Sequence, residues 1–146
     1  MTVRTTALAA LILGGAMFAA APAYAEVINM SAELNGASEV PANDSAGTGM
    51  LEATYDTDSN EFAWTVTYDG LTGEATAAHF HGPAAPDATA SPVVPIEGPM
   101  ASPITGTATL TDDQATALQD GMWYFNVHTA AHPDGEIRGQ VMAAAM

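Results

Sequence analysis

The stretch Asn60 to Tyr68, NEFAWTVTY, decides the fold class of this chain. Its large apolar side chains Phe62, Trp64 and Val66 occupy every second position, and polar or small residues lie between them. Successive side chains of a β-strand point to opposite faces of the sheet. This alternation therefore predicts a strand with one buried face and one exposed face.

The residues before this stretch show the same alternation. Leu51, Ala53 and Tyr55 share one face of a predicted strand over 49–55. The two strands are separated by Asp56 to Asn60, a cluster of the polar residue types that form turns. We therefore predict that the two strands form an antiparallel hairpin.

Other parts of the chain complete an all-β pattern. We predict further strands over 27–34, 75–81, 104–110, 122–129 and 136–142. A loop is expected between His81 and Ile104, with only a short apolar piece at 93–96. Short strands separated by turns predict an antiparallel β-sandwich, of the type found in immunoglobulin domains and in Cu,Zn superoxide dismutase.

One short helix is predicted after Thr111. Thr111 and Gln114 have the spacing of a capping box, in which each residue satisfies a backbone N–H of the other. Ala115 and Leu118 are expected to pack inward, and Gly121 suits the end of a helix.

Composition excludes several classes of function. The 146 residues include 17 acidic and 2 basic side chains, which gives a net charge of −15, and no cysteine. Without cysteine the chain has no disulfide, thiolate metal site or cysteine nucleophile. We exclude nucleic acids and anionic membranes as partners, because binding phosphate groups needs clustered lysine and arginine.

Residues 1–25, MTVRTTALAALILGGAMFAAAPAYA, have the three parts of a secretory signal peptide. Arg4 lies in a short first region, an apolar region follows over 7–20, and the end has the small-residue pattern of a cleavage site. A membrane anchor is the alternative, but the apolar region is short and interrupted by glycine. We predict cleavage after Ala25 and a secreted or periplasmic domain over 26–146.

The four histidines lie in two short segments, and three of them are candidate metal ligands. On a strand, His79 and His81 project from the same face. If the strand that carries His128 is its neighbour, three imidazoles converge, and three neutral nitrogen ligands suit copper or zinc. His132 lies in a predicted turn and is a weaker candidate for the same site. The alternative is that these histidines only form hydrogen bonds within a polar layer.

Glu136 and Arg138 form a second group of interest. They are expected to share one face of a strand, with Ile137 pointing into the core. Arg138 is the only basic side chain beyond the predicted signal peptide, so we expect it to have a carboxylate partner. We predict a structural ion pair between Glu136 and Arg138. An anion-binding or catalytic guanidinium is the alternative.

Three motifs resemble the CHRD domain family, which is named after chordin. In order they are HFHGPA at 79–84, GMWYFNVHT at 121–129 and GEIRGQ at 135–140. The resemblance runs from about Val27 to Val141 and implies an extracytoplasmic β-sandwich module, found singly in secreted bacterial proteins and repeated in chordin. His79, His81 and His128 match motif positions, whereas the family often has asparagine at the position of His132.

The resemblance implies no defined activity, and the growth-factor binding of chordin is not carried over because its cysteine-rich modules are absent here. The HFHG segment at 79–82 also resembles the copper strand of Cu/Zn superoxide dismutase. The bridging histidine, zinc loop, disulfide and basic channel of that enzyme have no counterpart in this chain. We predict a binding module with one copper or zinc ion at His79, His81 and His128, and no catalytic residue. A structural or adhesive module without metal, and a copper-dependent oxidoreductase, are the alternatives.

Overall fold

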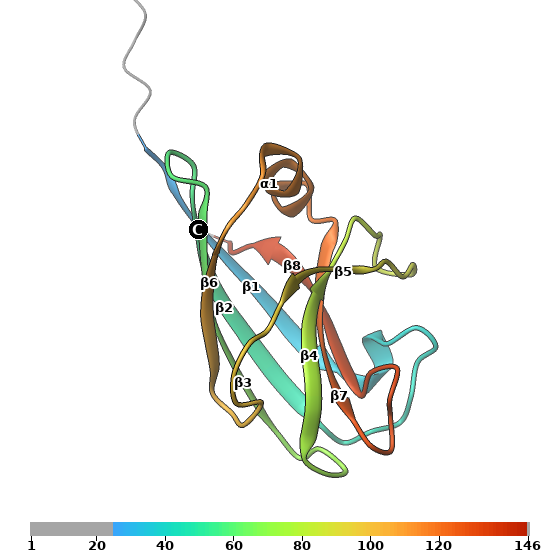
Figure 1. Ribbon diagram of the computed structural model, residues 1–146. Coiled ribbons are helices and arrows are strands. Elements are labelled where there is room, and N and C mark those ends of the chain that lie inside the picture. The colour runs from blue at the N-terminus through green and yellow to red at the C-terminus, as the bar shows by residue number, and fades with distance from the viewer. Residues whose placement is uncertain (1–24, 146) are drawn as a thin grey trace, which may run out of the picture.

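In the computed structural model, residues 25–145 are described, so the predicted signal peptide lies outside the described residues except for Ala25. The described chain forms eight strands, one α-helix and one short 3-10 helix (Figure 1). The strands are β1 (Val27–Asn35), β2 (Thr48–Asp56), β3 (Glu61–Asp69), β4 (Ala75–His81), β5 (Pro92–Pro95), β6 (Ile104–Thr109), β7 (Trp123–Thr129) and β8 (Ile137–Ala143). The helices are η1 (Gly36–Ser38) and α1 (Asp112–Gln119).

All eight strands belong to one antiparallel sheet, in the order β5-β4-β7-β8-β1-β2-β3-β6. Pairing between β8 and β1 joins two four-stranded halves, and the sheet curves around a common interior with α1 at one end (Figure 1). The prediction of an all-β, sandwich-like fold with one short helix is confirmed. The continuous strand order makes the sandwich nearly barrel-shaped.

The core follows the predicted alternation. Phe62 and Val66 are fully buried, and Trp64 is 6% exposed. The Phe62 ring meets Phe80 of the opposite half edge-on, with ring centroids 5.1 Å apart. Edge-to-face packing of this kind is favourable beyond the burial of apolar area alone. Strand β3 therefore supplies the centre of the core.

The hairpin between β2 and β3 is confirmed. Tyr55 pairs with Phe62 next to the turn, and the carboxylate of Asp56 accepts hydrogen bonds from the backbone N–H groups of Asp58 and Ser59. Asn60 closes the turn with a φ of 57°, a left-handed conformation that asparagine tolerates better than most residues.

The expected loop between β4 and β6 contains a strand that the sequence analysis did not predict. β5 pairs with β4, with Val94 opposite Phe80, and Val94 is buried in the core. β5 is an edge strand, so only one of its sides forms hydrogen bonds within the sheet. Prolines, which lack an N–H, are therefore tolerated at both of its ends. Four residues with two prolines carry too little alternation to be identified from the sequence.

Helix α1 forms as predicted. The Thr111 hydroxyl accepts a hydrogen bond from the Gln114 N–H, and the Gln114 side chain accepts one from the Thr111 N–H. Ala115 and Leu118 are buried, and Gly121 follows the helix with a φ of 70°. Across residues 25–145, we find no helix with the length and apolar character needed to cross a membrane.

Candidate metal centre

The two strands that carry the candidate histidines, β4 and β7, are neighbours in the sheet. His79 lies opposite Asn126, and His81 lies opposite Tyr124. Phe80 is fully buried in the core, so the histidines on either side of it project from the outer face of the sheet. The condition on which the predicted convergence of three histidines depended is therefore met.

The side chains of His79, His81 and His128 come together on this face. Each offers one nitrogen, and the three nitrogen atoms lie within 4.8 Å of one another. The closest two are His79 Nδ1 and His128 Nε2, which are 3.1 Å apart. Because metal–nitrogen bonds are about 2 Å long, nitrogens at such separations can share one ion.

The protonation of His128 is set by a backbone carbonyl. His128 Nδ1 lies 2.9 Å from the carbonyl oxygen of Pro133. A carbonyl oxygen only accepts hydrogen bonds, so Nδ1 must carry the proton. In the neutral ring the lone pair is then on Nε2, the atom that faces His79.

His81 is oriented in the same way by a different loop. Its Nδ1 lies 2.8 Å from the carbonyl oxygen of Ala90, and its ring stacks on Tyr124 with ring centroids 4.7 Å apart. In the neutral ring the lone pair of His81 is again on Nε2. Metal-binding histidines commonly donate their second ring N–H to a carbonyl, and two of these three do so.

Burial favours the neutral form of the histidines. Burial lowers the pKa of His79, and the neighbouring His128 and His81 lower it further. Burial also lowers the pKa of His81, although the oxygens of Ala90 and Asn126, to which only the charged ring can donate at both nitrogens, act in the opposite direction. Since a histidine must be neutral to bind a metal ion, the surroundings favour the form that a metal needs.

His132 does not join the other three histidines in this cluster. Its backbone N–H donates to the carbonyl of Thr129 over 3.1 Å, and its carbonyl accepts from the Thr129 N–H over 3.3 Å. These two bonds close the turn directly after β7. The His132 carbonyl also accepts from the Gly135 N–H over 3.1 Å, which closes the following turn at Pro133 and Asp134. His132 therefore supports this loop through its backbone alone, and its side chain is not part of the cluster.

The structure gives Glu136 and Arg138, the predicted ion pair, separate hydrogen-bond partners. Glu136 accepts hydrogen bonds from the hydroxyls of Ser45, Thr72 and Thr129, at 2.6, 2.8 and 2.6 Å. Glu136 precedes β8, where strand alternation no longer fixes the direction of the side chain. Burial opposes its charge, but these hydrogen bonds outweigh burial and lower the pKa of Glu136 to about 2.

Arg138 instead holds a loop over the outer face. Its Nη2 donates to the carbonyls of Ala88 and Pro86, at 2.7 and 3.1 Å, and its Cζ lies 3.5 Å from the centre of the Tyr124 ring. A planar guanidinium can stack on a ring and bind several carbonyls at once. The loop that Arg138 holds also carries Ala90, whose carbonyl orients His81.

Two buried residues of the site were given no role by the sequence analysis. Asn126 is 3% exposed, and its Oδ1 lies 3.0 Å from His81 Nε2. Glu39 is 6% exposed, and burial raises its pKa to about 7, although Arg138 and Asn126 act to lower it. Asn126 and His128 are two residues apart on β7 and share its outer face, so strand alternation could have placed Asn126 beside the cluster. Glu39 comes from the segment after η1, and no local pattern brings it here.

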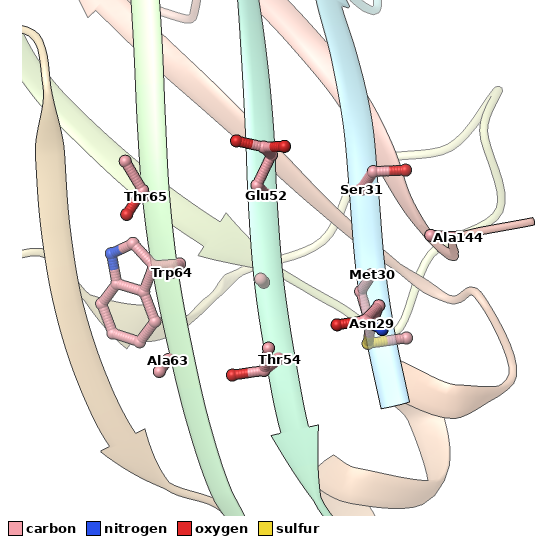
Figure 2. A pocket seen from close by; sticks show the side chains of 10 residues that line it. Asn29, Met30, Ser31, Glu52, Thr54, Ala63, Trp64, Thr65 and Ala144 are labelled. Atoms are coloured by element: carbon pink, nitrogen blue, oxygen red, sulfur yellow. The ribbon is translucent and has the colours of Figure 1, made fainter. Parts of the chain in front are cut away.

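A shallow hollow of about 390 Å³ lies elsewhere, on the outer face of β1, β2 and β3 (Figure 2). Its rim includes Ser31, Glu52 and Thr65, whose side chains are labelled in the figure. Glu52 is the one carboxylate in its lining, and no histidine lines it. This hollow therefore has no set of metal ligands and is separate from the histidine cluster.

Comparison with known proteins points to one family. A sequence model of the CHRD domain matches residues 30–141, which include all three histidines of the cluster. No curated protein and no solved structure matches the chain.

Proposed function

This chain belongs to the CHRD domain family, and we propose that it is a binding module that holds one copper or zinc ion through His79, His81 and His128. The observation that carries the proposal is the orientation of two of these rings. His81 and His128 each direct Nδ1 at a backbone carbonyl, at 2.8 and 2.9 Å. Each ring therefore has Nε2 available as a ligand before any ion arrives.

The ligand chemistry supports copper or zinc as the ion. Imidazole nitrogen suits both metals, whereas magnesium and calcium prefer oxygen ligands. The chain has no cysteine, so thiolate ligands are not available. Its net charge of −15 also favours the approach of a cation over that of an anion.

Titration calorimetry of the purified chain with Zn(II), and separately with Cu(II), tests this proposal. We expect one ion per chain and at least a tenfold loss of affinity in H128A. H132A is the matched control, because His132 lies outside the cluster, and it should bind like the wild type. Binding that is absent, or that is equal in H128A and H132A, would overturn the proposal.

We also propose that the chain is exported and cleaved after Ala25. The three-part pattern of residues 1–25 supports this, as does the lack of cysteine, since the domain needs no disulfide to fold. N-terminal sequencing of the protein recovered from a bacterial periplasm or culture medium should begin at Glu26. A chain that keeps Met1 and stays in the membrane fraction would instead indicate an anchor.

A structural module without metal is the second candidate, and one observation favours it. The hydrogen bonds of His128 and His81 already link β7 and β4 to the adjoining loops. If this is the whole role of the histidines, H79A should lower the unfolding temperature equally with and without a chelator. If metal binding is the function, the wild type should lose stability in the chelator and H79A should not respond to it.

A further inference from the structure

We propose that Asn126 is a fourth ligand, so that the site binds a divalent ion through three imidazole nitrogens and one amide oxygen. This inference rests on the proposed metal site and extends it. Asn126 is a residue of β7, directly opposite His79 and two residues before His128 on the same face. It is 3% exposed, and it lies on a strand, where side chains are held more firmly than on loops.

The contact between Asn126 and His81 lacks a proton when His81 is neutral. Asn126 Oδ1 and His81 Nε2 are 3.0 Å apart. The proton of a neutral His81 is on Nδ1, which faces the carbonyl of Ala90. Nε2 and Oδ1 are then two acceptors that face each other, an arrangement that a shared cation makes favourable.

The amide of Asn126 cannot relieve this contact by rotating end for end, because its other side faces acceptors. Nδ2 lies 3.5 Å from the carbonyl oxygen of Asp134. Nδ2 and Glu39 Oε1 also converge on Gly135, where any side chain would collide with both. Rotation of the amide would turn Oδ1 toward these oxygens, so the surroundings keep Oδ1 directed at His81.

Gly135 makes this arrangement compatible with the backbone. Its φ is 128°, a conformation that residues with a side chain rarely adopt. It precedes Glu136, and the Glu136 N–H is bonded to the carbonyl of Val127, so the turn is held against β7. Glu39 can therefore approach Asn126 closely, and we assign it the role of a positioning residue for the amide.

The 3.0 Å separation of Asn126 Oδ1 and His81 Nε2 suits two ligands of one ion. Metal–nitrogen and metal–oxygen bonds of about 2.1 Å that meet near a right angle place the two ligand atoms roughly 3 Å apart. Three nitrogens with one amide oxygen favour Zn(II) or Cu(II). Cu(I) prefers sulfur ligands, and this set offers none.

The test compares N126A and N126D with the wild type by Zn(II) calorimetry and by electron paramagnetic resonance of the Cu(II)-loaded chain. N126A removes the oxygen, so we expect affinity to fall roughly tenfold or more and the copper hyperfine splitting to change. N126D keeps an oxygen at the same place but loses the amide N–H groups, so its copper spectrum should stay close to that of the wild type. Q140A is the matched control, because Gln140 is on the same face and bonds to Ala84 and Gly121.

The outcomes separate this inference from the proposed function. If the wild type binds no ion, or binds without its histidines, the proposed metal site itself fails. If the wild type binds through its histidines and N126A matches it in affinity and spectrum, only the role of Asn126 is overturned. If N126A fails to fold, N126D decides the question. A folded N126D whose copper spectrum differs from that of the wild type would contradict oxygen ligation.

Discussion

His128 Nε2 lies 3.1 Å from His79 Nδ1, and a backbone carbonyl outside the pair determines which nitrogen of His128 makes this contact. The carbonyl belongs to Pro133, in the turn that the Gly135 N–H closes by donating to the His132 carbonyl. The geometry of the candidate site therefore depends on the turn after β7 as well as on the strand. Without a metal ion, the Nδ1–H of His79 donates a hydrogen bond to His128 Nε2.

This relationship predicts the ring tautomers of the metal-free protein. His128 should carry its proton on Nδ1, whereas the more common tautomer of free histidine carries it on Nε2. Long-range nitrogen–carbon correlation spectra of the histidine rings distinguish the two forms at neutral pH. An Nε2-protonated His128 would contradict the assignment, and His132, outside the cluster, provides the reference signal within the same spectrum.

Arg138 should matter for stability because of its shape as well as its charge. R138K keeps the charge but cannot stack on Tyr124 while it bonds to Ala88 and Pro86. We expect the free energy of unfolding to fall by about 2 kcal/mol, as measured by urea denaturation. Zn(II) affinity should also fall, because the loop with Ala90 loosens. A variant as stable as the wild type would show that charge alone suffices.

Much of this fold could be predicted from the sequence, for reasons visible in particular residues. The spacing of Phe62, Trp64 and Val66 identified β3, because alternation is a local property. β5 was missed because its four residues, two of them prolines, show too little alternation, and only the pairing with β4 makes them a strand.

The site shows the same division between local and distant contacts. The convergence of His79, His81 and His128 followed from two strand patterns and one assumed pairing. The roles of Arg138 and Glu39 depend on loop contacts. Arg138 bonds to carbonyls about 50 positions earlier, and no spacing rule encodes that contact.

The capping box of α1 predicts a moderate stability effect. T111A removes the hydroxyl that accepts from the Gln114 N–H, so the free energy of unfolding should fall by about 1 kcal/mol. T116A is the matched control, because the Thr116 hydroxyl donates to the carbonyl of Asp112 within the helix and caps no free N–H. Urea denaturation of both variants checks the prediction, which is wrong if T116A costs as much as T111A.

Glu136 predicts how stability responds to acid. Its pKa is lowered in the folded state to about 2 from the usual 4.5, so the folded chain releases this proton more readily than the unfolded chain does. The resulting stability is fully present above about pH 4.5 and is lost as pH falls toward 2.

E136Q removes the titrating group, so between pH 6 and pH 3 its unfolding temperature should fall less than that of the wild type. At pH 6, E136Q should be the less stable protein, because one acceptor oxygen becomes a donor. That donor would face either the Ser45 hydroxyl and the Thr72 N–H, or the hydroxyls of Thr72 and Thr129. E52Q is the control for loss of a carboxylate, since Glu52 is exposed on the outer face of β2. Equal acid responses in E136Q and the wild type would show that other carboxyl groups control acid unfolding.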